Sequence, residues 1–120
     1  MPSLTDPDRL LAYKDALSNW QIRDYIQFEL SEASHRWIRR ELGSITLRDI
    51  GRLMYEYVAA GGEVDEQAET RENWRDQHEF HHDLRLSINN RLVYIETRLN
   101  YRVPVPPDDS QILVVNIHEC

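Results

Sequence analysis

The sequence predicts an α+β domain in which two or three N-terminal helices pack on a three-stranded antiparallel sheet. In the first half of the chain, apolar residues recur at three- and four-residue steps, which is the spacing of one helix face. From Phe80 onwards they alternate with polar residues, as they do in a strand. Helices that precede and stay apart from an antiparallel sheet are typical of α+β architecture.

The length of 120 residues is that of one domain, so a single domain is expected over residues 1–120. Within it we expect helices over about 7–62, a polar connection over 63–77 and the sheet over about 78–119. Apolar residues make up 41% of the chain and charged residues 29%, which is ordinary composition for a folded domain.

The first helix is predicted to begin at Asp6-Pro7, an N-cap residue followed by proline at the first helical position. A helical stripe continues from Ile22 to Trp37, and Gly43 stands where a left-handed C-cap would close it. Thr46 and Asp49 form the pattern of a capping box for the next helix, which the Gly-Gly pair after Ala60 ends.

Three strands are predicted in the second half of the chain. The first covers Phe80 to Ile88, and Asn89-Asn90 supplies the positive φ angles that a two-residue hairpin needs. RLVYIETRL follows as the second strand, and QILVVNIHE, rich in β-branched residues, is the third. An unprotected edge of this third strand invites pairing with a second copy, so a homodimer is one expected assembly.

Charge and composition favour some functions over others. The net charge of −7 repels phosphate backbones unless a local basic patch overcomes it. Cys120 is the one cysteine, which excludes an internal disulfide and fits a reducing cytoplasm. No run of 18 apolar residues occurs, so no membrane span is expected. We therefore expect an acidic cytoplasmic protein with no membrane contact.

Residues 78–82 spell HEFHH, the H-E-x-x-H pattern with which helices hold zinc. On a helix, His78 and His82 would share one ion, with Glu96 or His118 as a third ligand and the glutamate acting on zinc-bound water. On a strand, their Cα atoms would lie roughly 13 Å apart, too far for one ion. The alternation that starts at Phe80 favours the strand, and zinc stays the lesser alternative to a chain without cofactor.

The side of the sheet that faces away from the helices collects polar residues. The candidate catalytic residues on it are His81, Arg85, Tyr94, Glu96, Arg98 and His118. Imidazoles titrate near neutrality and guanidinium groups bind phosphate in a fork, so this set suits acid–base chemistry and anion binding. The alternative is a solvated face with surface ion pairs such as Arg85 with Glu96.

Four segments follow one another over residues 46–120: TLRDIGRLMYEYVAAGG, ENWRDQ, LVYIETRL and ILVVNIHE. In order and apolar pattern they resemble the RelE-type bacterial ribonuclease toxins, nearest the motility quorum-sensing regulator toxins. The resemblance implies a metal-independent endoribonuclease paired with an antitoxin, and a role for Tyr94 and Arg98. Such toxins are basic, whereas this chain has Glu96 and ends in His-Glu-Cys where lysines would be expected, which implies lost or altered catalysis.

Three functions follow from these observations. The first, which asks least of the sequence, is a binding or regulatory domain that acts on a protein partner through its acidic surface, as in a toxin–antitoxin system. The second is the endoribonuclease, with His81, Arg85, Tyr94 and Arg98 as acid, base and phosphate ligands and RNA as its substrate. The third is the zinc hydrolase with His78 and His82.

Overall fold

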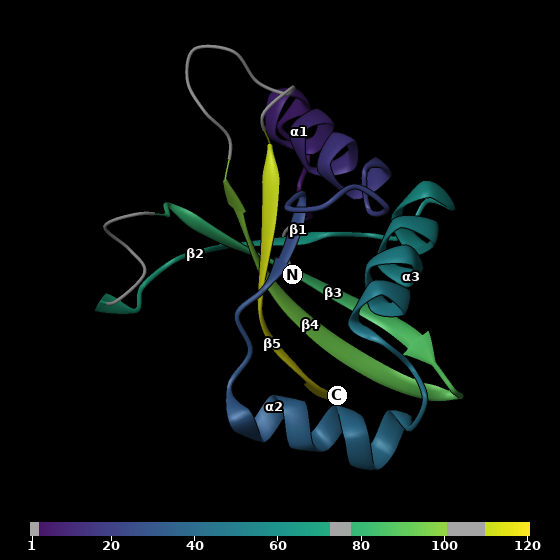
Figure 1. Ribbon diagram of the computed structural model, residues 1–120. Coiled ribbons are helices and arrows are strands. Elements are labelled where there is room, and N and C mark those ends of the chain that lie inside the picture. Colours follow the sequence, from purple (N-terminus) through teal and green to yellow (C-terminus); the bar gives the residue numbers. More distant parts are fainter. Residues whose placement is uncertain (1–2, 73–77, 101–109) are drawn as a thin grey trace.

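The computed structural model describes residues 3–72, 78–100 and 110–120, and within them it forms an α+β fold (Figure 1). Three α-helices, one π-helical turn and five strands make up these residues. The predicted class is confirmed, but the predicted three-stranded antiparallel sheet is wrong in detail. The sheet has five strands in the order β1-β5-β4-β3-β2, and β1 runs parallel to β5.

The helices begin where the capping residues predict. In α1 (Pro7–Ser18), the carboxylate of Asp6 accepts a 2.9 Å hydrogen bond from the backbone N–H of Arg9. In α3 (Leu47–Ala59), Thr46 and Asp49 form both hydrogen bonds of a capping box. Between them lies α2 (Glu32–Trp37), which continues as the π-helical turn η1 (Ile38–Leu42) and ends at Gly43 with φ of 61°.

The predicted helical stripe from Ile22 to Trp37 is wrong in its first part. Ile26–Phe28 is a short strand, β1, that pairs in parallel with residues 112–114 of β5. Its two apolar residues also fit a helical stripe, so the local pattern alone does not separate the two conformations. The parallel partner, more than 80 residues away along the chain, supplies the hydrogen bonds that stabilise the strand.

The predicted hairpin is present. Strands β3 (Phe80–Ile88) and β4 (Arg91–Asn100) are antiparallel, and Asn89 and Asn90 join them with φ of 52° and 65°. Two positive φ angles are those of a type I′ turn, whose twist matches that of the two strands. Strand β5 (Gln111–Glu119) lies antiparallel on the other side of β4.

Two features of the sheet escape the sequence pattern. Strand β2 (Asp65–Ala68) lies inside the expected polar connection and pairs antiparallel with β3. In β5 the register shifts by one residue, because Glu96 faces Asn116 whereas Thr97 faces Val114. Val115 is therefore the extra residue of a β-bulge.

The outer edge of β5, which the sequence offered for pairing between two copies, is occupied by β1 over residues 112–114. The two edge strands of the described sheet are β1 and β2. The expected homodimer through the third strand therefore has no free edge along that part of β5.

The helices α1 and α3 pack against one face of the sheet, and α2 packs along β5 (Figure 1). The core lies between these layers. Its fully buried side chains include Tyr13 and Leu17 from α1, Ile50 and Met54 from α3, and Leu84, Ile95 and Ile117 from the sheet. No helix in the described part of the chain has the length and apolar character needed to cross a bilayer.

Candidate functional site

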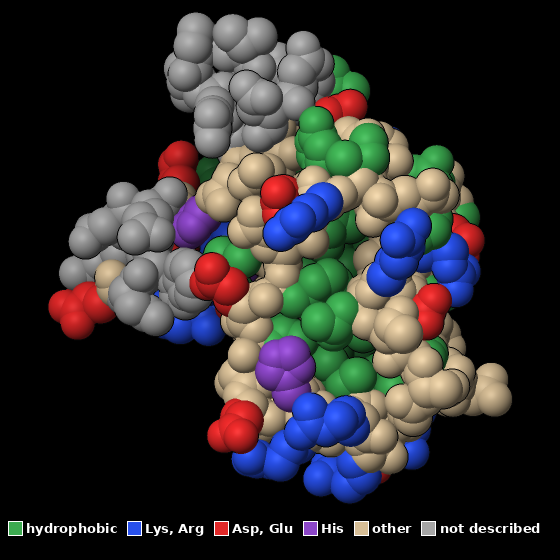
Figure 2. All heavy atoms as spheres, viewed as in Figure 1, with side chains coloured by type: hydrophobic (Ala, Val, Ile, Leu, Met, Phe, Trp, Pro, Cys, Tyr) green, Lys and Arg blue, Asp and Glu red, His purple; other side chains and the backbone are tan. Residues whose placement is uncertain are grey.

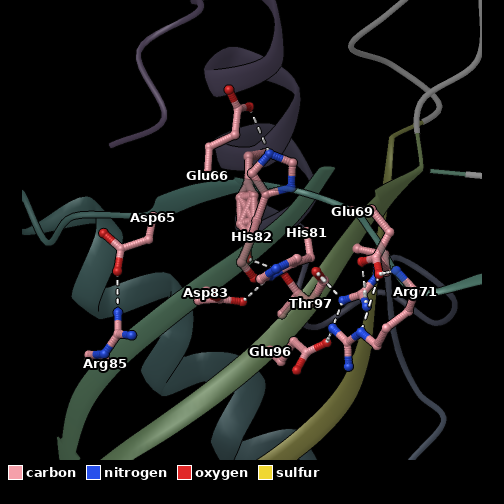
Figure 3. A network of polar contacts seen from close by, with 12 residues as sticks. Asp65, Glu66, Glu69, Arg71, His81, His82, Asp83, Arg85, Glu96 and Thr97 are labelled. Atoms are coloured by element: carbon pink, nitrogen blue, oxygen red, sulfur yellow. Dashed lines mark hydrogen bonds and ion pairs between the residues drawn. The ribbon is translucent and has the colours of Figure 1, made fainter. Parts of the chain in front are cut away.

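The far face of the sheet, away from α1 and α3, gathers the polar residues that the alternation placed there, and four of them, His81, Asp83, Arg85 and Glu96, can be followed in Figure 3. Across β3 and β4, Asp83 faces Glu96 and Arg85 faces Tyr94. On β5, His118 faces Tyr94 and Asn116 faces Glu96. The structure therefore brings the predicted candidates onto one surface, although their accessibility differs widely.

His81 and Asp83 form an imidazole–carboxylate pair at this face. The Nδ1 atom of His81 lies 2.9 Å from Oδ1 of Asp83, whose side chain is only 3% exposed. Because a carboxylate accepts hydrogen bonds, Nδ1 is the donor in this contact, and in the neutral form of the imidazole Nε2 is then the nitrogen with the lone pair. The Nε2 atom has no hydrogen-bond partner among the described residues. This arrangement is that of an imidazole oriented to act as a base.

Tyr94 is the neighbour of this pair on β4. The guanidinium of Arg85 lies 5.2 Å from the centre of the Tyr94 ring, and the ring of His118 stacks on it at 4.8 Å. Burial, followed by the negative charges of Asp83 and Glu96, raises the pKa of Tyr94 well above its usual value. Tyr94 therefore keeps its proton at neutral pH, and its hydroxyl group is a hydrogen-bond donor.

Arg85 does not form the ion pair with Glu96 that was expected for a solvated polar face. Its guanidinium forms an ion pair with Asp65 of β2, a strand that the sequence pattern does not predict. About a third of the Arg85 side chain stays exposed. Its positive charge is therefore shared between Asp65 and the face of the Tyr94 ring.

Arg98 lies at the centre of a buried ionic network. Its Nη2 atom is 2.7 Å from a carboxylate oxygen of Glu69, and its Nη1 atom is 2.8 Å from one of Glu96. Arg71 bridges the same two carboxylates. Burial opposes ionisation of Glu96, but the hydrogen bonds from Arg71 and Arg98 outweigh it and lower the pKa of Glu96.

The predicted role of Arg98 as a phosphate ligand does not agree with this position. Its side chain has no exposed surface, and its charge already faces two carboxylates. Glu96 is likewise 4% exposed and held by two arginines. Both side chains therefore belong to this buried network, and neither has appreciable surface with which to contact a substrate.

A second polar cluster lies on the helix side of the sheet, around His82. The Nε2 atom of His82 is 3.0 Å from Glu66, and Glu66 accepts two hydrogen bonds from Arg9, at 2.8 and 2.9 Å. His82 is 2% exposed, and burial lowers its pKa. It is therefore a neutral core histidine.

The Tyr13 hydroxyl closes this cluster from α1. It lies 2.7 Å from Oγ1 of Thr97, and that Oγ1 donates a 2.6 Å hydrogen bond to the carbonyl oxygen of His82. Because the Thr97 hydroxyl has one hydrogen, Tyr13 donates to Thr97. Burial raises the pKa of Tyr13, so the chain of hydrogen bonds is stable at neutral pH.

The HEFHH segment is extended from Phe80 onwards, as the alternation predicted. The two histidines of the zinc pattern have different surroundings: His82 contacts Glu66, whereas His78 lies near Arg98 and Glu69, and burial followed by Arg98 lowers its pKa. Within residues 3–72, 78–100 and 110–120, no three His, Cys, Asp or Glu side chains are grouped closely enough to hold a metal ion.

Several residues of these clusters were missed from the sequence. They are Arg9, Tyr13, Asp65, Glu66, Glu69, Arg71 and Thr97. The mixed charges of residues 63–77 are the only sequence signal for four of them. A run of this kind usually lies in solvent, so the burial of Asp65 and Glu69 was not expected.

Comparisons with models of protein families, with curated proteins and with solved structures find no match to this chain.

Proposed function

We propose that this chain is a metal-independent endoribonuclease in which His81 and Tyr94 are the catalytic residues and Asp83 is a positioning residue. The observation that carries the proposal is the 2.9 Å contact between His81 Nδ1 and the buried Asp83 carboxylate. It orients an imidazole on the same face of the sheet as Tyr94, a tyrosine that keeps its proton. The resemblance to RelE-type toxins favours the same reaction class, with catalytic residues that differ from those of the family.

RNA carries its own nucleophile, the 2′-hydroxyl group, so its cleavage needs a base, an acid and charge stabilisation. Nε2 of His81 accepts the 2′-hydroxyl proton while that oxygen attacks the adjacent phosphorus. The bond from phosphorus to the 5′-oxygen breaks, and this oxygen takes the proton of Tyr94. The products are a 2′,3′-cyclic phosphate and a 5′-hydroxyl end.

Arg85 supports the second half of this reaction. Its guanidinium lies over the Tyr94 ring at 5.2 Å, so it stabilises the phenolate that forms when Tyr94 gives up its proton. A proton then returns from the His81 imidazolium to Tyr94 through water. Atoms and charges balance without a further reactant.

The test is cleavage of a single-stranded RNA by the purified chain in the presence of EDTA. We expect products with 2′,3′-cyclic phosphate ends, and a loss of rate of about 10²-fold or more in His81→Ala and in Tyr94→Phe. Tyr55→Phe, a tyrosine change in α3, is the matched control and keeps full rate. Expression of the wild-type chain in a bacterium should also arrest growth, and Tyr94→Phe should relieve the arrest.

The proposal fails if the wild-type chain leaves RNA intact under these conditions. It also fails if His81→Ala and Tyr94→Phe cleave as fast as the wild-type chain, because a contaminating nuclease would then explain the products.

A second candidate function is the binding of a protein partner. A groove of about 510 Å³ lies between β1 and the start of α3, with Trp20, Ile26, Phe28 and Leu47 among its lining residues. Figure 2 shows hydrophobic side chains in the hollow between α1, α3 and α2. Ile22 at its rim is 55% exposed. An apolar groove beside an edge strand suits an extended peptide that adds to the sheet.

This candidate predicts no turnover and a partner that stays bound during purification. Ile22→Glu should release such a partner while the thermal melting temperature stays unchanged, because Ile22 contributes little buried surface. A bound partner that is unaffected by Ile22→Glu would place the interface elsewhere.

A further inference from the structure

A cleft separates α2 and η1 from the C-terminal half of β5. Its volume is about 350 Å³, within the range of ligand sites. Arg36 and Arg40 line it from the helical side, and Asn116 and His118 line it from the strand. Figure 2 shows Lys and Arg side chains gathered at the lower end of the molecule, over α2. The cleft is thus a local basic surface on a chain whose net charge is −7.

The two arginines line the same cleft, Arg36 from α2 and Arg40 from η1, and are held loosely. Arg36 is 3.8 Å from Glu32, and Arg40 is 3.2 Å from Glu41, with 59% and 68% of the two arginine side chains exposed. Exposed ion pairs of this kind contribute little to stability. A phosphate group can therefore replace either carboxylate at small cost.

Glu41 is also bound by another cation. Arg91 lies 2.8 Å from it and is the first cause of its lowered pKa. The carboxylate that faces Arg40 is thus already satisfied by Arg91. Of the two arginines that contact Glu41, Arg40 has the longer contact, so its guanidinium is the more available to another anion.

The strand side of the cleft has ordered polar groups. Oγ of the buried Ser34 donates a 3.0 Å hydrogen bond to Oδ1 of Asn116, which leaves the Asn116 amide hydrogens to act as donors. The Nδ1 atom of His118 is 2.8 Å from the carbonyl oxygen of Glu119, so Nδ1 carries the hydrogen. Trp37, partly exposed in the cleft, offers a ring face on which a base can stack.

His118 connects the cleft to the far face of the sheet. It lines the cleft and at the same time stacks on Tyr94 at 4.8 Å. Polar side chains therefore lead from Arg36 and Arg40 in the cleft, through His118, to Tyr94 on the far face. On the far face itself, Arg71, Arg85 and Arg98 are all paired with carboxylates. A substrate phosphate backbone therefore needs positively charged side chains from beside that face, and Arg36 and Arg40 of the cleft are such side chains.

We infer that the cleft between α2 and β5 binds the phosphodiester backbone of single-stranded RNA and leads the strand to Tyr94. Arg36 and Arg40 bind phosphates, Trp37 stacks a base, and Asn116 donates hydrogen bonds. The choice of RNA rests on the proposed function, whereas the binding of a phosphate backbone rests on the cleft alone.

The experiment measures binding by fluorescence anisotropy with a labelled single-stranded RNA of about ten nucleotides. Its riboses carry 2′-O-methyl groups, so it cannot be cleaved. We expect Arg36→Ala/Arg40→Ala to bind about tenfold or more weakly. The slope of log affinity against log salt should fall by about 1.4, which is 0.7 for each lost phosphate contact. Arg36→Lys/Arg40→Lys should keep most of that slope.

The matched control is Arg23→Ala/Arg52→Ala, which removes the same charge from two exposed sites outside the cleft. Equal loss of affinity in both double variants would overturn the inference, because overall charge would then explain binding. Absence of binding by the wild-type chain would overturn it too. So would a phosphoserine peptide that displaces the RNA at lower concentration than unlabelled RNA does, since the cleft would then serve a peptide.

The same samples separate this inference from the proposed function. If His81→Ala binds the methylated RNA like the wild-type chain but cleaves unmodified RNA at an undiminished rate, the catalytic proposal fails and the binding cleft stands. If Arg36→Ala/Arg40→Ala binds normally while His81→Ala loses cleavage, the cleft is overturned and the catalytic proposal stands.

Discussion

The Nε2 atom of His82 lies 3.0 Å from the carboxylate of Glu66, and this contact joins the sheet to α1 because Glu66 also binds Arg9. His82 was a candidate zinc ligand in the sequence, and in the structure it is a neutral side chain inside the core. Its position makes the stability of the fold sensitive to pH.

We predict that the chain loses stability as the pH falls below about 6.5. Burial lowers the pKa of His82 in the folded chain, so the unfolded chain binds the extra proton first. Stability is fully present above the unfolded pKa of histidine and decreases as the pH falls through that value. The pKa of Glu66 is lowered by Arg9 and His82 against the opposing effect of burial, and it acts in the same direction at lower pH.

Denaturant unfolding at a series of pH values measures this dependence. His82→Gln should flatten the curve between about pH 6.5 and 5, with a smaller slope left by His78, whose pKa burial also lowers. His118→Gln, an exposed change, is the control. An unchanged slope in His82→Gln would show that other groups set the pH dependence.

Removal of Arg98 should destabilise the fold strongly. Arg98→Met leaves Glu69 and Glu96 buried without this partner, and breaking a buried ion pair costs about 3–5 kcal/mol. The free energy of unfolding from urea titration measures the loss. Arg52→Ala, which breaks exposed pairs with Asp49 and Glu56, should change it by less than about 1 kcal/mol. Equal effects of the two changes would contradict the network's structural role.

Two tyrosines should respond in opposite ways to the same substitution. Tyr13→Phe deletes the buried hydrogen bond to Thr97 and should cost about 1 kcal/mol of stability with cleavage activity retained. Tyr94→Phe should remove cleavage activity and leave stability nearly unchanged. Thermal melting and an RNA cleavage assay on both variants check this pair. If Tyr94→Phe melts early and stays active, Tyr94 is structural.

Asp83→Asn should reduce cleavage through the tautomer of His81. The amide of asparagine can donate to Nδ1, which moves the imidazole hydrogen to Nε2, the atom that must accept a proton. We expect a loss of roughly 10²-fold or more and a displaced pH–rate profile. A variant with lower activity but an unchanged profile would indicate a loss of folding instead.

The hairpin of β3 and β4 was predictable because its signals are local. Alternation defines both strands, and Asn89-Asn90 defines the turn between them. The polar strand β2 was not predictable, because DEQA has no apolar alternation and its side-chain partners on β3, Arg85 for Asp65 and His82 for Glu66, lie far from it along the chain. Its edge position needs no hydrophobic side chains on both faces.

The candidate site was likewise predictable only where the signals in the sequence are local. Alternation correctly placed His81, Tyr94 and Arg98 on one face. It could not show that Glu69 and Arg71, from the connection after β2, fold over Arg98 and bury it. Which residues of a face reach solvent depends on contacts between segments that are far apart in the chain. The two-residue alternation of a strand carries no information about these contacts.

The bulge at Val115 determines the orientation of everything after it in β5. If the pairing set by Thr97 and Val114 carried on without an unpaired residue, His118 would face Val93 inside the core. The stacking on Tyr94 and the strand side of the arginine cleft both depend on this shift of register. Loss of one residue between Asn116 and His118 would therefore turn His118 toward the core, whereas loss of Val115 itself would leave His118 opposite Tyr94.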